Sequence, residues 1–96
     1  MKNIYGEVVK PQYEVAIQRH VEGSVDDDFE SVDFVDASNY RDGAKKAKNL
    51  SLSDQYGDCK QWRIALICYY SDDVSTYNQA WEDIYIKGKK VERYEF

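Results

Sequence analysis

The fold class is set by one stretch of the chain, Trp62-Arg63-Ile64-Ala65-Leu66-Ile67-Cys68-Tyr69-Tyr70. Apolar side chains occupy both odd and even positions of this stretch, so a strand formed by it has two apolar faces. Such a strand lies in the interior of a fold, because a strand with one face in water alternates apolar and polar residues. We therefore expect a central strand with a helix packed against one side.

Two segments nearer the start of the chain are predicted to pair as a hairpin. Residues 13–21 alternate apolar and polar side chains, which is typical of a half-buried strand. Residues 23–28 supply a turn of Gly, Ser and Asp. Residues 29–35 continue as a second strand, with Val32 and Phe34 at two-residue spacing.

A helix is expected between this hairpin and the central strand, ending at about Leu50. Asp36 or Ser38 supplies the N-cap, because the side chains of both accept hydrogen bonds from the first helical N–H groups. Gly43 is unfavourable inside a helix and indicates a close approach to the sheet. The narrow apolar stripe consists of Ala37, Tyr40, Ala44 and Ala47.

Residues 80–86 and 91–96 are predicted to form a closing hairpin with its turn at residues 87–89. Residues 1–12 are ambiguous: residues 4–9 could form a short edge strand, which Pro11 would end. The chain, residues 1–96, is thus expected to form a single α+β domain in the order β-β-α-β-β-β. Its core is one antiparallel sheet of about five strands with one helix packed on one face.

Charge and composition restrict the functional classes. The 96 residues include 18 acidic and 13 basic side chains, a net charge of −5. Binding of DNA or RNA depends mostly on Lys and Arg that neutralise phosphates, so we expect a basic protein partner and no direct nucleic-acid contact. A charge of this size also serves solubility alone, which is the alternative. No apolar run is long enough for a membrane span and residues 1–7 lack a secretory signal, so we expect a cytoplasmic protein without membrane contact.

No pattern in the sequence indicates catalysis, a metal or a cofactor. Cys59 and Cys68 are too few for a disulfide scaffold or a zinc site. Residues 26–28 and 72–73 lack the ligand spacing of an EF-hand calcium loop. His20 is the only histidine, and no nucleophile motif accompanies it. We therefore expect a non-enzyme that uses neither cofactor nor metal.

Acidic residues are concentrated in the first hairpin, where residues 22–36 carry seven carboxylates and no Lys or Arg. Alternate side chains of a strand are ~6–7 Å apart, similar to consecutive phosphates of one DNA strand, so this edge could mimic DNA in a nucleic-acid-binding groove. The alternative is a solvated hairpin with an acidic tip, because Asp favours turns; that explains residues 26–28 but not Asp33. The candidate partner-binding residues are Glu22, Asp26, Asp27, Asp28, Glu30, Asp33 and Asp36.

Two aromatic residues of the closing hairpin, Trp81 and Tyr85, complete the candidate partner-binding set. They share one face of their strand, whereas Ile84 and Ile86 share the other, and a domain of two layers cannot bury both faces fully. Because Trp and Tyr dominate binding hot spots, we expect this side of the hairpin to offer them to a partner. The alternative is that the N-terminal segment covers them.

Basic residues are concentrated on the expected helix and in the last hairpin. Gathered on one side of the domain, they would form a small nucleic-acid-binding surface, which is a second functional hypothesis. The alternative is an ordinary solvated helix face, with lysines that protect an edge strand from aggregation. These residues are Lys45, Lys46 and Lys48, then Lys87, Lys89, Lys90 and Arg93.

In size, acidity, tyrosine content and strand order, and in its carboxylates from Glu22 to Asp36, the chain resembles the small acidic inhibitors encoded by phages and mobile elements, such as the anti-CRISPR proteins. The resemblance implies a phage protein in the host cytoplasm that binds a larger bacterial protein or nuclease complex and blocks its DNA or guide-RNA site. It implies no cofactor and no catalysis. Toxin-neutralising immunity proteins share the same profile and stay an alternative, and the sheet edges are compatible with a homodimer.

Overall fold

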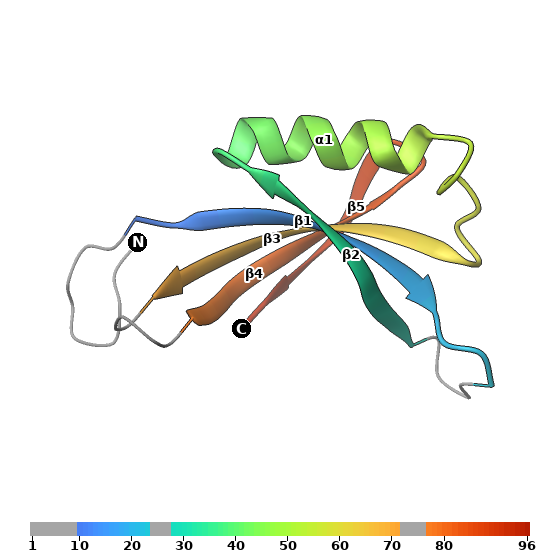
Figure 1. Ribbon diagram of the computed structural model, residues 1–96, viewed down its shortest axis with the longest axis horizontal. Coiled ribbons are helices and arrows are strands. Elements are labelled where there is room, and N and C mark those ends of the chain that lie inside the picture. Colours follow the sequence, from blue (N-terminus) through green and yellow to red (C-terminus); the bar gives the residue numbers. More distant parts are fainter. Residues whose placement is uncertain (1–9, 24–27, 72–76) are drawn as a thin grey trace.

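One helix lies across one face of a five-stranded antiparallel sheet (Figure 1). The computed structural model describes residues 10–23, 28–71 and 77–96, so the edge strand considered at residues 4–9 lies outside the described part. The order β-β-α-β-β-β and the α+β class confirm the prediction from the sequence. The elements are β1 (Gln12–His20), β2 (Phe29–Ala37), α1 (Tyr40–Leu52), β3 (Trp62–Ser71), β4 (Tyr77–Ile86) and β5 (Lys89–Glu95).

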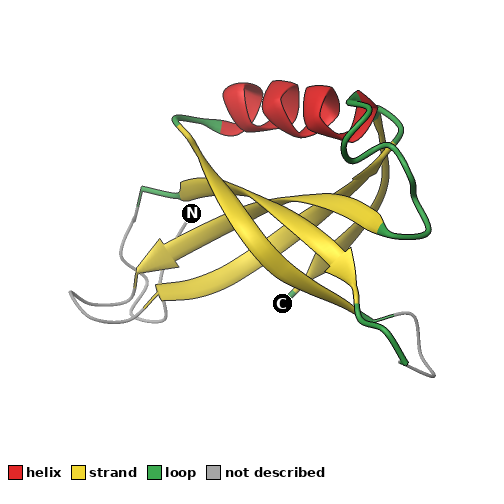
Figure 2. Cartoon of the chain, turned by 45° about the vertical axis from the view of Figure 1, so that its right-hand side comes forward, coloured by secondary structure: helices red, strands yellow, loops and turns green. Residues whose placement is uncertain are grey.

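The strands lie in the order β2-β1-β3-β4-β5, and every neighbouring pair is antiparallel. The apolar stretch therefore forms the middle strand, β3, and the edges are β2 and β5. Figure 2 shows the helix on one side of the twisted sheet, and no other described helix or strand covers the opposite side.

The core between helix and sheet contains the side chains that point toward α1. Val15 and Ile17 of β1 pack there with Ile64 and Leu66 of β3 and with Ala47 of the helix. All of these side chains are buried, and full burial of one Val, Leu or Ile side chain contributes roughly 1.5–3 kcal/mol. Val15 and Ile17, two of the apolar residues in the alternation of residues 13–21, face this core, whereas Ala16 and Gln18 are buried on the other face of β1.

A second cluster lies on the helix-free face of the sheet. Ala16, Ala65, Ile67 and Ile84 are buried there and contact one another, with Tyr69 packed against them. Strand β3 is thus apolar on both faces because each face belongs to a different cluster.

The helix begins at a cap that the sequence did not single out. Asn39 is the N-cap, and its side-chain oxygen accepts a hydrogen bond from the backbone N–H of Asp42 at 2.8 Å. The Asp42 carboxylate in turn accepts a bond from the N–H of Ser38 at 3.0 Å, a reciprocal arrangement similar to a capping box. The prediction of Asp36 or Ser38 as the N-cap is wrong, because Asp36 still belongs to β2 and Ser38 serves as a donor.

The end of the helix is attached to the turn between β4 and β5. The Ser51 hydroxyl donates to the carbonyl oxygen of Lys48 and accepts a bond from the N–H of Gly88 at 2.8 Å. Lys87 and Gly88 both have positive φ, as a two-residue type I′ hairpin turn requires. The predicted turn is confirmed, and it lies directly against the last helical turn.

We expect Gly43→Ala to destabilise the fold by about 1 kcal/mol, although alanine favours helices. A β-carbon at Gly43 would collide with Leu66 Cδ1 in the core and lie 3.3 Å from the side chain of Ala37. Urea unfolding would measure the change, with Lys45→Ala on the exposed helix face as a control that shifts stability by less than about 0.5 kcal/mol. A Gly43→Ala protein more stable than the parent would contradict the close contact.

Candidate functional site

The acidic segment forms an edge of the sheet. Strand β2 pairs with β1 on one side only, so its outer backbone faces away from the sheet. Asp26 and Asp27 lie outside the described residues. The five carboxylates that the structure describes are all exposed: Glu22, Asp28, Glu30, Asp33 and Asp36.

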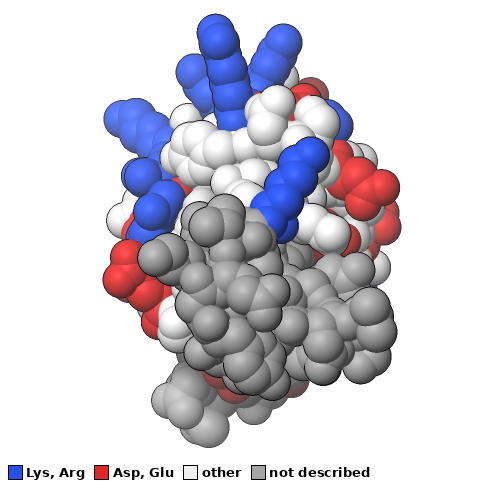
Figure 3. Space-filling model, turned by 90° about the vertical axis from the view of Figure 1, so that its left-hand side faces the viewer, with Lys and Arg blue, Asp and Glu red and all other residues white. Residues whose placement is uncertain are grey.

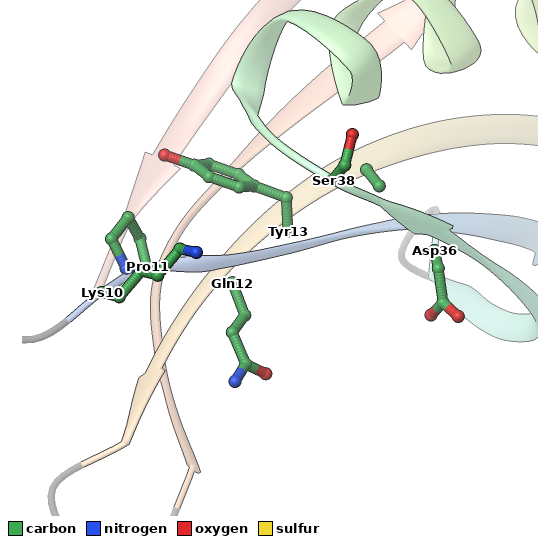
Figure 4. A pocket seen from close by; sticks show the side chains of 7 residues that line it. Lys10, Pro11, Gln12, Tyr13, Asp36 and Ser38 are labelled. Atoms are coloured by element: carbon green, nitrogen blue, oxygen red, sulfur yellow. The ribbon is translucent and has the colours of Figure 1, made fainter.

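The carboxylates of β2 project from both faces of the strand. Asp33 is opposite Ile17, which points toward the helix, and Asp36 is opposite Glu14, which points away from it. Figure 4 shows that the Asp36 side chain points to the side of the sheet opposite to that of Tyr13. The carboxylates therefore surround the edge and do not form a single row on one face.

Their interactions within the chain are weak. Glu30 lies 3.3 Å from the guanidinium of Arg19, and both side chains are about half exposed, at 55% and 49%. An exposed pair of this kind contributes about 0–1 kcal/mol. The Asp33 carboxylate accepts a hydrogen bond from the backbone N–H of Phe34. These carboxylates thus keep most of their capacity to attract a cation.

The negative edge continues onto the helix-free face through Glu14. Burial raises the pKa of Glu14, and the carboxylate of Asp36 raises it further, whereas a hydrogen bond with Tyr69 lowers it. Like charges directly opposite each other on neighbouring strands are destabilising. Glu14 was not predicted as a site residue; the signal for it is its place on the polar face of β1, beside a strand rich in Asp.

Apolar side chains are exposed on the same strand. The side chains of Phe34 and Val32 in this edge strand are 48% and 43% exposed, although both are apolar. Val32 occupies a bulge, where the pairing with β1 shifts between Ile17 and Gln18. The β2 edge therefore combines carboxylates with exposed apolar groups, a composition suited to contact with protein.

The two aromatic candidates lie under the helix. Tyr85 is 6% exposed and belongs to the helix-side core, so the expectation of an open hairpin face presenting Tyr85 is corrected. Burial raises the pKa of its hydroxyl to about 12, with a contribution from nearby Tyr40. Trp81 packs against the rings of Tyr13 and Tyr40, with centroids 6.1 and 5.8 Å away. Helix α1 covers this face because Ala44 and Ala47 allow it to pack closely.

A buried ion pair adjoins these rings. Asp83 is fully buried and receives two hydrogen bonds from Arg93 of β5, at 2.6 and 2.9 Å. The bond with Asp83 raises the pKa of Arg93 above its usual value. The guanidinium also stacks over Trp81 at 4.1 Å. Arg93 is therefore a structural residue that ties β5 to β4, and it does not belong to an open basic surface.

The remaining basic residues come closer together than their positions in the sequence suggest. Lys45 and Lys48 are exposed on the helix, and the Ser51–Gly88 hydrogen bond brings the lysines of the β4–β5 turn to the helix end. Figure 3 shows Lys and Arg gathered over the helix layer at the top of the molecule. Lys46 is engaged separately, with Asp42 and with the carbonyl oxygen of Asp36.

The described residues line several small hollows of the surface. One of about 340 Å³ lies between Lys10 and Ser38 (Figure 4), and another of about 400 Å³ lies around His20. Among the described residues, no group of three His, Cys, Asp or Glu side chains is placed to hold a metal ion. Cys59 and Cys68 are free thiols, and Cys68 is buried. Within the same residues, no helix is long and apolar enough to cross a membrane.

No protein-family model matches the chain, and neither a curated protein nor a solved structure matches it significantly. Function must therefore be inferred from the residues and their geometry.

We expect Glu14→Gln to unfold at a higher urea concentration than the parent at about pH 7. Because the folded state raises the pKa of Glu14 above 4.5, protonation of this side chain favours folding, and this contribution is lost as pH rises through the folded-state pKa. Glutamine keeps an acceptor for Tyr69 without the charge. The difference in stability between Glu14→Gln and the parent should become smaller at about pH 4, where Glu14 of the parent is largely protonated. A variant less stable than the parent at neutral pH would contradict the repulsion with Asp36.

Proposed function

We propose that this protein is a non-enzymatic binding module that attaches through the β2 edge to a basic surface of a partner protein. One observation carries the proposal: Glu30, Asp33 and Asp36 are exposed along an edge strand that carries no Lys or Arg. Glu14 adds a fourth carboxylate beside Asp36. A cation placed between Glu14 and Asp36 would relieve their mutual repulsion, so binding a basic group is favoured over leaving the pair alone.

The partner is a protein that handles nucleic acid, and binding inhibits it. A groove that binds DNA or RNA is lined by Lys and Arg, which an acidic edge attracts at long range and pairs with at contact. Occupied by this edge, such a groove is closed to its own substrate. The resemblance to phage-encoded inhibitors makes a bacterial CRISPR nuclease loaded with guide RNA the first partner to test.

We expect the variant Glu30→Gln, Asp33→Asn, Asp36→Asn to bind a guide-loaded CRISPR nuclease about tenfold more weakly than the parent at low salt. Its affinity should also depend less on salt concentration, because fewer ion pairs form. A matched control with the same change in charge is Asp54→Asn, Asp58→Asn, Glu95→Gln, which leaves β2 intact. Binding assays with the immobilised nuclease at two salt concentrations would measure the affinity and its salt dependence for the parent and both triple variants.

Equal effects of the two triple variants would contradict a role for β2 and leave only a general effect of net charge. Parent protein that binds none of a panel of guide-loaded nucleases would contradict the choice of partner. Inhibition is tested in the same panel by DNA cleavage, where the parent should slow cleavage and the β2 variant should not.

A second candidate function, binding of nucleic acid through the helix and turn lysines, is favoured by the Ser51–Gly88 contact. The contact places Lys89 near the end of the helix that carries Lys45 and Lys48, and these lysines form no ion pair that the described residues show. A gel shift with labelled duplex DNA and with RNA at about 50 mM salt tests it. A shift that Lys45→Gln, Lys48→Gln, Lys89→Gln abolishes would establish this function, and no shift of the parent would remove it.

A further inference from the structure

The outer side of β2 presents backbone groups that a further strand could pair with. The N–H of Phe34 donates to the carboxylate of Asp33 at 2.9 Å, and the carbonyl oxygen of Asp36 accepts a bond from Lys46 Nζ at 2.8 Å. Neither bond goes to β1. In an antiparallel pair, alternate residues point their N–H and C=O groups to the same side, so residues 34 and 36 present theirs at the free edge.

The side chains that occupy these two groups are replaceable. The Asp33 carboxylate stands where a strand carbonyl would accept the Phe34 N–H, and the Lys46 ammonium stands where a strand N–H would donate to Asp36. A typical intramolecular hydrogen bond contributes only about 0.5–1.5 kcal/mol net, and a strand would form equivalent bonds in return. Lys46 also keeps its contact with Asp42, at 3.0 Å, when it leaves Asp36.

A groove lies beside this edge, between β2 and the helix. It has a volume of about 300 Å³, and its surface is mainly apolar. Its lining residues are Val35, Lys46, Asn49, Leu50 and Ser53. Val35 points toward the helix-side core, so the groove is on the side of β2 that faces α1. The volume is at the lower limit of small-molecule clefts, which suits one apolar side chain better than a cofactor.

The charges of β2 select the occupant. A second copy of β2 laid along this edge would set carboxylates against carboxylates, which is destabilising for strands side by side. A segment with Lys or Arg at alternate positions would direct these side chains to one face, and on the helix-free face they would meet Asp36 and Glu14. The side chains between them then lie on the helix side, where the groove is. Charge complementarity therefore favours a basic segment over a homodimer.

We propose that an extended basic segment of a partner protein adds to the sheet as a sixth strand on the outer edge of β2 and places one apolar side chain in the groove beside α1. The proposal rests on the proposed function and names the chemistry that the partner contributes. Strand addition next to a helix is an established mode of peptide recognition, in which main-chain bonds supply affinity and side-chain pockets supply specificity.

The probe is a fluorescein-labelled dodecapeptide of alternating lysine and valine, with alternating glutamate and valine as the control peptide. Binding is measured by fluorescence anisotropy, and 15N-labelled protein reports which amides shift. Two variants block the proposed mode. The first, Phe34→Pro, removes the outward N–H without removing a bond to β1. Its control is Phe34→Ala, which removes the same side chain but keeps the N–H. Asn49→Phe fills the groove, and Gln55→Phe is its exposed control.

We expect the lysine peptide to bind the parent and to shift amides of β2 and of residues 49–53. Phe34→Pro should bind at least about fivefold more weakly than Phe34→Ala, and Asn49→Phe at least about fivefold more weakly than Gln55→Phe. Thermal unfolding verifies that each variant is folded before it is compared.

A lysine peptide that binds no better than the glutamate peptide contradicts the proposed function, because no basic segment is then preferred. If the lysine peptide is preferred but both blocking variants bind like their controls, the edge-strand mode is wrong and the attraction to basic partners stands. Self-association of the parent through β2, seen as shifts of the same amides on concentration without peptide, would overturn the choice of a basic partner over a second copy.

Discussion

A single helix of 13 residues can cover only one face of a five-stranded sheet, and most features of this molecule follow from that limit. The apolar residues of β3 that face α1 form the main core, and those on its other face must be protected by neighbouring strands. The outer sides of the two edge strands, β2 and β5, have no neighbouring strand among the described residues. Each edge must then be either protected against pairing with other chains or used for it.

The two edges differ in how they are protected. At β5, Arg93 crosses to the buried Asp83 and stacks on Trp81, and Lys89 and Lys90 are exposed along the strand. Lysine on an edge is a common means of preventing further pairing. At β2, only exposed side chains occupy the outward backbone groups, and an apolar groove lies alongside. Of the two edges, β2 is therefore the one suited to receive a partner.

Local sequence patterns predict most of the secondary-structure elements of this fold. The alternation of residues 13–21, the doubly apolar stretch 62–70 and the turn at Lys87-Gly88 each predict their elements, because all three depend on near neighbours in the chain. The N-cap was misplaced since Asp36, Ser38 and Asn39 all cap helices, and only the length of β2 selects Asn39. The burial of Tyr85 depends on which sheet face the helix occupies, which no local pattern states.

The candidate site was predictable in composition but not in geometry. The sequence shows that carboxylates are concentrated in one hairpin, whereas the bulge at Val32 and the strand's alternation decide which face each one takes. The addition of Glu14, and the groove between Val35 and Leu50, arise only when β1, β2 and α1 come together. Sequence patterns do not predict these two features, because each depends on contacts between residues that are distant in the chain.

The openness of the β2 edge is tested most directly by amide hydrogen exchange of the dilute free protein, followed residue by residue. The N–H of Phe34, which donates to an exposed carboxylate, should exchange about a hundredfold or more faster than the amides of Ile64 to Ile67 in the central strand. Protection of Phe34 equal to that of the central strand would show that this edge is already covered, and would leave no free edge for a partner.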